Sequence, residues 1–241
     1  MSNAPVLAGV DGCPAGWIAV IGAPDDVPRV EIFARFAHLL AVLPDDAIVA
    51  VDMPIGLPDR ITGSGRGPEQ AIRPLLGQRQ SSVFSIPARS AVEAQDYREA
   101  CDAALATSDP PRKVSRQAFG LFHKILEIDA VMSPELECRV FEVHPELAFW
   151  RLNDERAMEL PKKIKGRVNP EGMDERIMLL AALDFPQTVL RAKPPRGAAA
   201  DDLLDACACH MIAQRLLEGT AKPFPDPPLM TEAGARMAIW A

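Results

Sequence analysis

The stretch VLAGVDGCPAGWIAV, residues Val6–Val20, decides the fold class because it holds two apolar runs around a turn. The first run ends at Asp11, the turn covers Gly12–Gly16, and the second run begins at Trp17. Apolar runs separated by a glycine-containing turn predict a β-hairpin. Aspartate is common in turns because its carboxylate accepts hydrogen bonds from nearby backbone amides. The local pattern therefore leaves two alternatives for Asp11, a turn residue or a carboxylate presented for chemistry.

The next segments extend the hairpin into an α/β unit. A third apolar run, Val30–Ala34, predicts a three-stranded antiparallel meander. Apolar residues at helical spacing predict a helix over Phe36–Leu43. The near-continuous apolar run AIVAVD, Ala47–Asp52, is typical of a strand buried on both faces of a parallel sheet. The helix before it then serves as the crossover.

The rest of the chain alternates helical and strand patterns. A strand is expected at Cys138–Val143, after a long loop at Ile61–Pro87 that holds one short helix. Helices are expected at about 91–106, 114–132, 173–183 and 199–217. We therefore expect one α/β domain over residues 1–241. Its mixed sheet is flanked by helices, and a helical insertion occupies about residues 60–135.

Composition limits the classes of protein to consider. The chain has 241 residues, 48% of them hydrophobic, which is enough for a sizeable core. No window offers the ~18 consecutive apolar residues of a membrane helix. The first residues lack a signal-peptide pattern, and the five cysteines show no CxxC spacing. We therefore expect a cytoplasmic protein with free thiols and no membrane partner. The oligomeric state stays open, with a homodimer among the alternatives.

The net charge of −7 argues against a protein that coats nucleic acid nonspecifically. It leaves nucleic acid open as a substrate, because cations bound by an acidic site reverse the local charge.

Acidic residues gather where the expected strands end. Asp11, Asp52 and Glu142 lie at or near strand ends, and Asp202 and Asp205 stand three apart on the last helix. Ligands of open α/β sheets bind at the carboxyl ends of the strands. Carboxylates that converge there repel one another, and Mg²⁺ or Mn²⁺ offsets the repulsion. Two such ions would activate a water and stabilise the leaving oxygen of a phosphodiester.

Each carboxylate taken alone has a structural alternative. Asp11 and Asp52 suit turns, Asp202 suits the first turn of a helix, and Glu142 suits an ion pair with an arginine. Asp205 is harder to explain in this way, because it lies within the apolar stretch LLDACACHMIA. A carboxylate on a buried helix face needs a partner or a metal.

Several segments resemble known proteins. The order meander, helix, strand, insertion, strand and final helix resembles the ribonuclease-H-like fold, and GVDGCPAGWIAVI and DDLLDACA resemble motifs of RuvC-type resolvases. The set GVDGCPAGW, VDMPIGLP, LGQRQSSVFSIPAR, VFEVHPE, DDLLDA and MAIW resembles a bacterial family of unknown function, described as predicted nucleases of RNase H fold. This resemblance spans nearly the whole chain.

The resemblance implies roles for the acidic residues. Asp11 matches the metal ligand of the first strand, and Asp202 and Asp205 match the final-helix pair. Asp52 takes the acidic position of the fourth strand, where resolvases carry Glu. Glu142 lies on the fifth strand, where only some relatives carry an acid. The implied metal ligands are Asp11, Asp52, Asp202 and Asp205, and Glu142 completes the catalytic set.

Basic and histidine residues supply candidates for contacts with substrate. Arg79, Arg89 and Lys163 lie in Gly/Pro-broken segments within or next to the family-like motifs, and arginine and lysine bind phosphates. The alternative for such residues is a solvated surface. His144 directly follows the Glu142 strand and suits either substrate contact with proton transfer or a structural hydrogen bond.

Three functions follow from these patterns. The leading expectation is a Mg²⁺- or Mn²⁺-dependent nuclease or phosphodiesterase that hydrolyses nucleic acid by a two-metal carboxylate mechanism. The second is an ATP-dependent phosphotransferase of actin or sugar-kinase type, although the sequence shows no second glycine-rich phosphate hairpin. The third is a non-catalytic scaffold domain whose carboxylates hold a structural ion.

Overall fold

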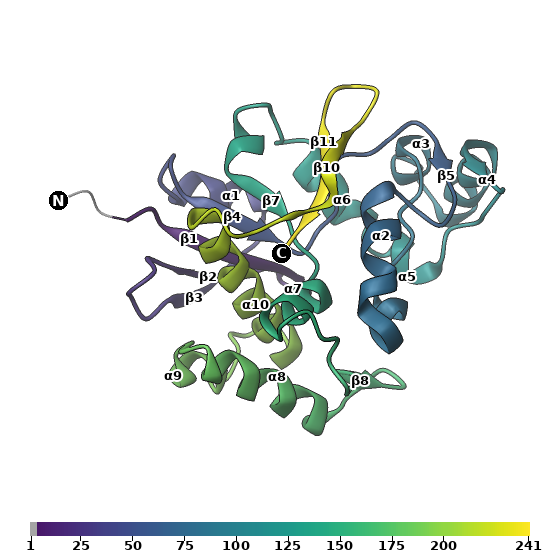
Figure 1. Cartoon of the computed structure of the whole chain (residues 1–241). Coiled ribbons are helices and arrows are strands. Elements are labelled where there is room, and N and C mark those ends of the chain that lie inside the picture. The colour runs from purple at the N-terminus through teal and green to yellow at the C-terminus, as the bar shows by residue number, and fades with distance from the viewer. Residues whose placement is uncertain (1–3) are drawn as a thin grey trace.

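Five strands form the central mixed sheet of the computed structural model, which describes residues 4–241 (Figure 1). They are β1 (Leu7–Cys13), β2 (Gly16–Gly22), β3 (Arg29–Phe33), β4 (Ile48–Val51) and β7 (Val140–Glu142). Their order across the sheet is β3-β2-β1-β4-β7. The first three are antiparallel, whereas β4 and β7 run parallel to β1. The expected meander and mixed α/β sheet are confirmed, and the arrangement is compatible with a ribonuclease-H-like fold.

Helices and small hairpins complete the fold. The helices are α1 (Phe36–Val42), α2 (Gly67–Ile72), α3 (Arg89–Val92), α4 (Tyr97–Thr107), α5 (Arg116–Phe119), α6 (Phe122–Asp129), α7 (Pro145–Leu152), α8 (Pro170–Ala182), α9 (Gln187–Leu190) and α10 (Ala200–Leu217), with 3₁₀ segments η1 (Arg73–Ser82) and η2 (Leu136–Cys138). The strands outside the central sheet are β5 (Ile61–Thr62), β6 (Ser108–Asp109), β8 (Lys163–Ile164), β9 (Arg167–Val168), β10 (Pro223–Met230) and β11 (Arg236–Trp240).

Alternation along the strands divides the core into two layers. On β2, Ile18 and Val20 face one layer while Trp17 and Ala19 face the other, as the period of two in a strand requires. Helices α7, α8 and α10 cover the first face. Helices α1, α3, α4, α5 and α6 contribute to the second layer. The region expected as a helical insertion thus packs against the sheet.

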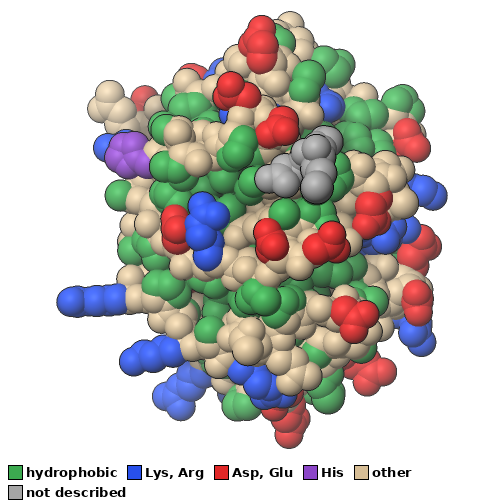
Figure 2. Space-filling model, turned by 90° about the vertical axis from the view of Figure 1, so that its left-hand side faces the viewer, with side chains coloured by type: hydrophobic (Ala, Val, Ile, Leu, Met, Phe, Trp, Pro, Cys, Tyr) green, Lys and Arg blue, Asp and Glu red, His purple; other side chains and the backbone are tan. Residues whose placement is uncertain are grey.

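The surface around the N-terminus carries charges of both signs. Figure 2 shows acidic side chains spread over this face, with basic side chains projecting mainly from its lower part. This mixture agrees with the modest net charge of −7. An extended basic surface, which nonspecific nucleic-acid binding requires, is therefore not seen on this face.

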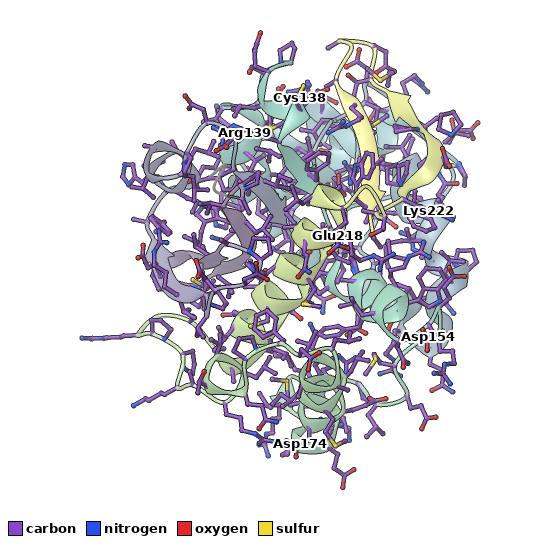
Figure 3. All side chains as sticks on the ribbon, turned by 60° about the vertical axis from the view of Figure 1, so that its left-hand side comes forward. Cys138, Arg139, Asp154, Asp174, Glu218 and Lys222 are labelled. Carbon is purple, nitrogen blue, oxygen red and sulfur yellow. The ribbon has the colours of Figure 1, made fainter. Side chains whose placement is uncertain are left out.

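Helix α10 lies directly against β1 because one strand position has no side chain. A Cβ added at Gly9 would stand 2.1 Å from the carbonyl oxygen of Ala206 and 2.1 Å from the amide nitrogen of His210. Figure 3 shows α10 crossing in front of the sheet towards Glu218. Asp11 shares the face of Gly9, two residues further along the strand. The close approach therefore brings the acidic turns of α10 to the level of Asp11.

The helical regions differ from expectation in one respect. The two long helices expected at 91–106 and 114–132 are each divided, into α3 and α4 and into α5 and α6. The Asp96 carboxylate accepts hydrogen bonds from the amides of Arg98 and Glu99 and starts α4 as a new helix. The pattern of apolar spacing continues across such a break, so periodicity alone merges the two helices.

The C-terminal hairpin was not expected from the sequence. Strand β10, whose sequence PFPDPPLM is rich in proline, pairs with β11. Proline cannot donate a ladder hydrogen bond, so such a segment reads as a loop. Here it forms one edge of a two-stranded sheet, where the missing donors can face away from the partner strand.

The cysteines agree with the sequence expectation of free thiols. All five cysteines are free, four of them are buried, and Cys138 is exposed beside Arg139 (Figure 3). Within residues 4–241, no helix has the length and apolar character needed to cross a membrane.

Candidate metal centre

Three carboxylates from separate elements meet at the carboxyl edge of the parallel strands. One oxygen each from Asp11, Asp52 and Asp205 lies within 4.8 Å of the others. Asp11 stands one residue past the last β1–β4 pair, and Asp52 follows β4, with its amide donating to the carbonyl of Val10 at 2.9 Å. Asp205 lies in the second turn of α10. The fold thus assembles three of the four metal ligands expected from the sequence.

The cluster has fewer protein partners than its burial requires. Oδ1 of Asp11 accepts a hydrogen bond from the amide of Gly12 at 2.6 Å, and Oδ2 of Asp205 accepts one from the ammonium of Lys162. Oδ1 of Asp205 is buried and has no hydrogen-bond partner among residues 4–241. A buried carboxylate oxygen without a donor is unfavourable. Such an oxygen, beside further carboxylates, fits the all-oxygen donor set that Mg²⁺ and Mn²⁺ take.

Burial and mutual repulsion raise the pKa values of these carboxyls. The pKa of Asp11 lies well above its ordinary value because of burial first and then repulsion by Asp52 and Asp205. Burial and the charge of Asp205 raise the pKa of Asp52 to about 8. Burial raises the pKa of Asp205 to about 6, although Lys162 opposes the shift. The metal-free cluster therefore retains protons near neutral pH, and a divalent cation would displace them.

A cavity of about 180 Å³ opens beside two of the three carboxylates. Asp11 and Asp52 line it, together with Ser82, Lys124 and His144. This volume is well above the ~10–15 Å³ that a single water requires, so several waters fit. A reacting group and an attacking water can therefore both reach the Asp11–Asp52 side of the cluster.

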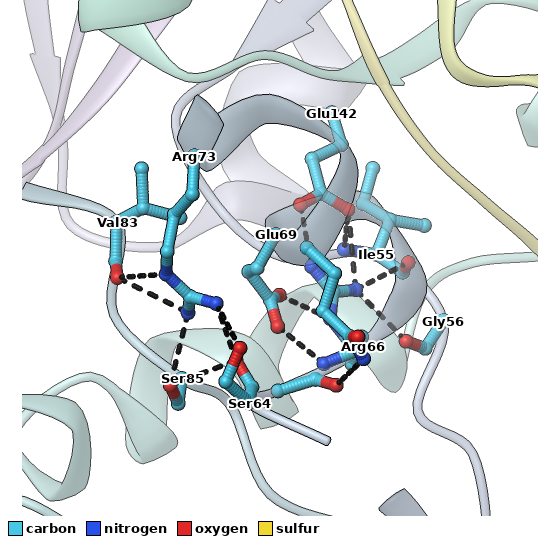
Figure 4. A network of polar contacts seen from close by, with 11 residues as sticks. Ile55, Gly56, Ser64, Arg66, Glu69, Arg73, Val83, Ser85 and Glu142 are labelled. Carbon is cyan, nitrogen blue, oxygen red and sulfur yellow. Dashed lines mark hydrogen bonds and ion pairs between the residues drawn. The ribbon is translucent and has the colours of Figure 1, made fainter. Parts of the chain in front are cut away.

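Glu142 also lines this cavity, but an arginine holds both of its oxygens (Figure 4). Nη2 of Arg66 lies 2.5 Å from Oε1, and the amide of Ile55 donates to Oε2 at 2.7 Å. Burial raises the pKa of Glu142 to about 7, against the opposing charge of Arg66. The alternative that Glu142 pairs with an arginine is confirmed, and this pairing leaves it less free for proton transfer than the sequence motif implies.

Arg66 is the centre of a buried network that supports the loop after Asp52. Its Nη1 donates to the carbonyls of Ile55 and Gly56 at 2.9 Å, and its Nε donates to Oε1 of Glu69 at 2.6 Å (Figure 4). The VDMPIGLP motif is thereby tied to the end of β7 and to the start of α2. The sequence signal was available in GRGPE, where Glu69 follows Arg66 at helical spacing.

Asp202 lies beside the cluster and outside it. Its Oδ2 accepts a hydrogen bond from the amide of Ala199 at 2.8 Å, at the first turn of α10. Its pKa is raised, mainly by burial, and its charge helps to raise the pKa of Asp11. The structural alternative for Asp202, an acid in the first turn of a helix, is confirmed.

The basic residues singled out from the sequence lie elsewhere. Arg89 donates to both oxygens of Asp129, at 2.7 and 2.9 Å. Lys163 pairs with Asp201 at 2.5 Å, and Arg79 is half-buried in η1. Within the described chain, none of Arg79, Arg89 and Lys163 lines the cavity beside Asp11. They stay candidates only for contacts with a substrate that extends beyond it.

Two other side chains face the cavity instead. His144 lines it, with Nε2 3.4 Å from the carbonyl oxygen of Ser82. Loss of solvent lowers the pKa of His144 to about 4, so its ring is neutral at pH 7. The ammonium of Lys124 donates to the carbonyl of Gly16 at 2.5 Å, at the β1–β2 turn. Sequence reasoning gave Lys124 no special role, because helical spacing does not show what an α6 residue faces across the sheet.

The comparisons with known proteins give one match. A family model described as "Protein of unknown function (DUF429)" matches residues 9–229. No curated protein and no solved structure matches the chain. The matched region contains all three clustered aspartates, and the family description assigns no activity to them.

Proposed function

The chain belongs to the DUF429 family of proteins of unknown function, and we propose that it is a divalent-cation-dependent phosphodiesterase acting on nucleic acid. The observation that carries the proposal is the convergence of Asp11, Asp52 and Asp205 within 4.8 Å at the cavity edge. Mg²⁺ or Mn²⁺ bound there would activate a water and withdraw charge from the phosphoryl oxygens. A cytoplasmic location, which five free cysteines favour, is part of the proposal.

The chain's own residues supply the remaining parts of such a reaction. Asp11 and Asp52, which line the cavity, would hold the ion, and the buried Arg66 network keeps the loop after Asp52 in position. In the reaction, water forms a bond to phosphorus, the P–O bond to the leaving oxygen breaks, and that oxygen departs with a proton. His144 is neutral at pH 7 and lines the cavity, so it serves as a hydrogen-bonding partner rather than as a positive charge.

A groove next to the cavity supports a polymeric substrate. It has a volume of about 1170 Å³ and shares Gly12 and Lys124 with the cavity. Its walls carry the exposed side chains of Arg35, His38 and His123. The acid in its lining, Glu127, is engaged with the indole nitrogen of Trp17. Phosphates of a strand that enters the cavity would meet cationic and hydrogen-bonding groups along this groove.

A cleavage assay tests this proposal. Purified protein is incubated with single-stranded, duplex and branched DNA and RNA, in Mn²⁺ or in EDTA. We expect cleavage that needs Mn²⁺ and that falls at least about a hundredfold in Asp52→Asn, since one ligand of the ion is lost. Asp46→Asn, an exposed aspartate outside the cluster, is the matched control and retains activity.

Two outcomes would contradict the proposal. Cleavage that continues in EDTA would show that the reaction does not require a divalent cation. Mn²⁺ binding without cleavage of any of these substrates would favour the alternative of a scaffold domain with a structural ion.

A further inference from the structure

We propose that this site takes one divalent cation, at Asp11 and Asp52, and that the ammonium of Lys162 stands at Asp205 in the place of a second ion. The inference rests on the proposed function and specifies its cation content. Lys162 bonds Oδ2 of Asp205, whose carboxylate is part of the three-residue cluster. The cavity beside the cluster is lined by Asp11 and Asp52. The two sides of the cluster thus differ, with an open pair of carboxylates on one side and a lysine on the other.

Charge pairing in the interior sets the number of ions. Five buried acids outside the open pair each have a cationic partner within 4 Å, as follows: Glu69 and Glu142 with Arg66, Glu146 with Arg176, Asp201 with Lys163, and Asp205 with Lys162. In residues 4–241, Asp11 and Asp52 take part in no ion pair. Two unpaired carboxylates carry a charge of −2 when ionised, which one divalent cation offsets. A second ion would leave the centre with excess positive charge unless Lys162 withdrew.

The backbone around Lys162 is held in place, so the position of its ammonium is built into the fold. Nη1 of Arg176 donates to the carbonyl of Leu160 at 2.9 Å. The side-chain Nδ2 of Asn169 donates to the carbonyl of Pro161 at 2.9 Å, and the backbone amide of Asn169 donates to the carbonyl of Lys162 at 2.7 Å. Three successive carbonyls are therefore each fixed by a neighbour on or next to α8.

Lys163, the next residue, provides a matched control for Lys162. Lys163 pairs with Asp201, one helical turn before Asp205 on α10, and Asp201 is outside the three-carboxylate cluster. The side chain of Lys163 is 48% exposed, whereas that of Lys162 is 17% exposed. The two residues have the same chemistry and the same kind of partner, and only Lys162 reaches the cluster.

Isothermal titration of the full chain with Mn²⁺ tests the inference. We expect one Mn²⁺ per chain for the wild type and for Lys163→Met. Lys162→Met should bind a second Mn²⁺, because the freed Asp205 joins Asp11 and Asp52 as a third carboxylate without a cationic partner. Lys162→Arg keeps the positive charge and should bind one ion. Circular dichroism before each titration verifies that the variants are folded.

The outcomes separate the inference from the proposed function. Two ions bound to the wild type, or one ion bound to a folded Lys162→Met, would overturn the inference and leave a metal-dependent hydrolase standing. No ion bound to the wild type would overturn the proposed function itself. If Lys162→Met does not fold, the Mn²⁺ stoichiometries of the wild type and of Lys162→Arg still test the inference. Two ions bound to either protein would overturn the single-ion site.

Discussion

Nη2 of Arg66 lies 2.5 Å from Oε1 of Glu142, and both side chains are buried, with exposures of 0% and 4%. Removing one member of a buried ion pair leaves the other charge without compensation. Arg66→Met, which strands both Glu142 and Glu69, should therefore lower the free energy of unfolding by about 3–5 kcal/mol in urea titrations.

Arg89→Met provides the comparison, because the Arg89–Asp129 pair is more than a quarter exposed. Its loss should change the free energy of unfolding by about 1 kcal/mol or less. An Arg66→Met protein of nearly wild-type stability that has lost activity would contradict this account, since it would place Arg66 and Glu142 in the chemistry rather than in the support of the loop.

The contact between Gly9 and α10 gives a second prediction. A methyl group at Gly9 would stand 2.1 Å from backbone atoms of Ala206 and His210, so the helix must shift. Gly9→Ala should lower the free energy of unfolding by about 3 kcal/mol or more, because backbone atoms of α10 rather than a flexible side chain must give way. Gly120→Ala, whose new Cβ meets its nearest neighbour at 3.3 Å, should change stability by about 1 kcal/mol or less. Unchanged stability in Gly9→Ala would refute the close packing.

The raised pKa of Asp52 predicts how the metal-free protein responds to pH. Its pKa is about 8 in the folded chain and 3.8 for an ordinary aspartate. The folded state therefore binds the Asp52 proton more tightly than the unfolded state. The contribution of this protonation to the free energy of unfolding is fully present below pH ~4 and is lost as the pH rises through about 8. In EDTA, the melting temperature of the wild type should fall across this window, and that of Asp52→Asn should fall less. Parallel curves for the two proteins would contradict the shift.

Metal binding should release protons for the same reason. Near pH 7 the cluster retains protons on carboxyls with raised pKa values, and a divalent cation displaces them. The heat of Mn²⁺ binding should therefore depend on the ionisation enthalpy of the buffer at pH 7, and this dependence should weaken at pH 9. A heat that is the same in all buffers at pH 7 would show that the ion binds groups that are already ionised.

Much of the fold could be predicted because the decisive signals are local. The alternation around Gly12–Gly16 and the apolar run before Asp52 identify β1, β2 and β4. The ends of parallel strands share one edge, so the placement of Asp11 near Asp52 also follows from the sequence. The apolar surroundings of Asp205 indicated its burial.

The rest depends on which way neighbouring side chains point. Lys162 and Lys163 are adjacent and chemically alike, and successive side chains of an extended segment point to opposite faces. The sequence favoured Lys163, whereas the structure places Lys162 at the cluster. Arg66 was likewise one of several arginines in an irregular loop, and its contacts with Glu142, 76 residues away in the chain, arise only from tertiary packing.

The most direct test of the central claim is a crystal structure of the protein with Mn²⁺, with the ion located by its anomalous scattering. We predict one peak, bonded to carboxylate oxygens of Asp11 and Asp52 at about 2.1–2.2 Å, with the Lys162–Asp205 pair still in place. The absence of a peak at Asp11 and Asp52 in crystals saturated with Mn²⁺ would contradict the claim that these carboxylates form a metal centre.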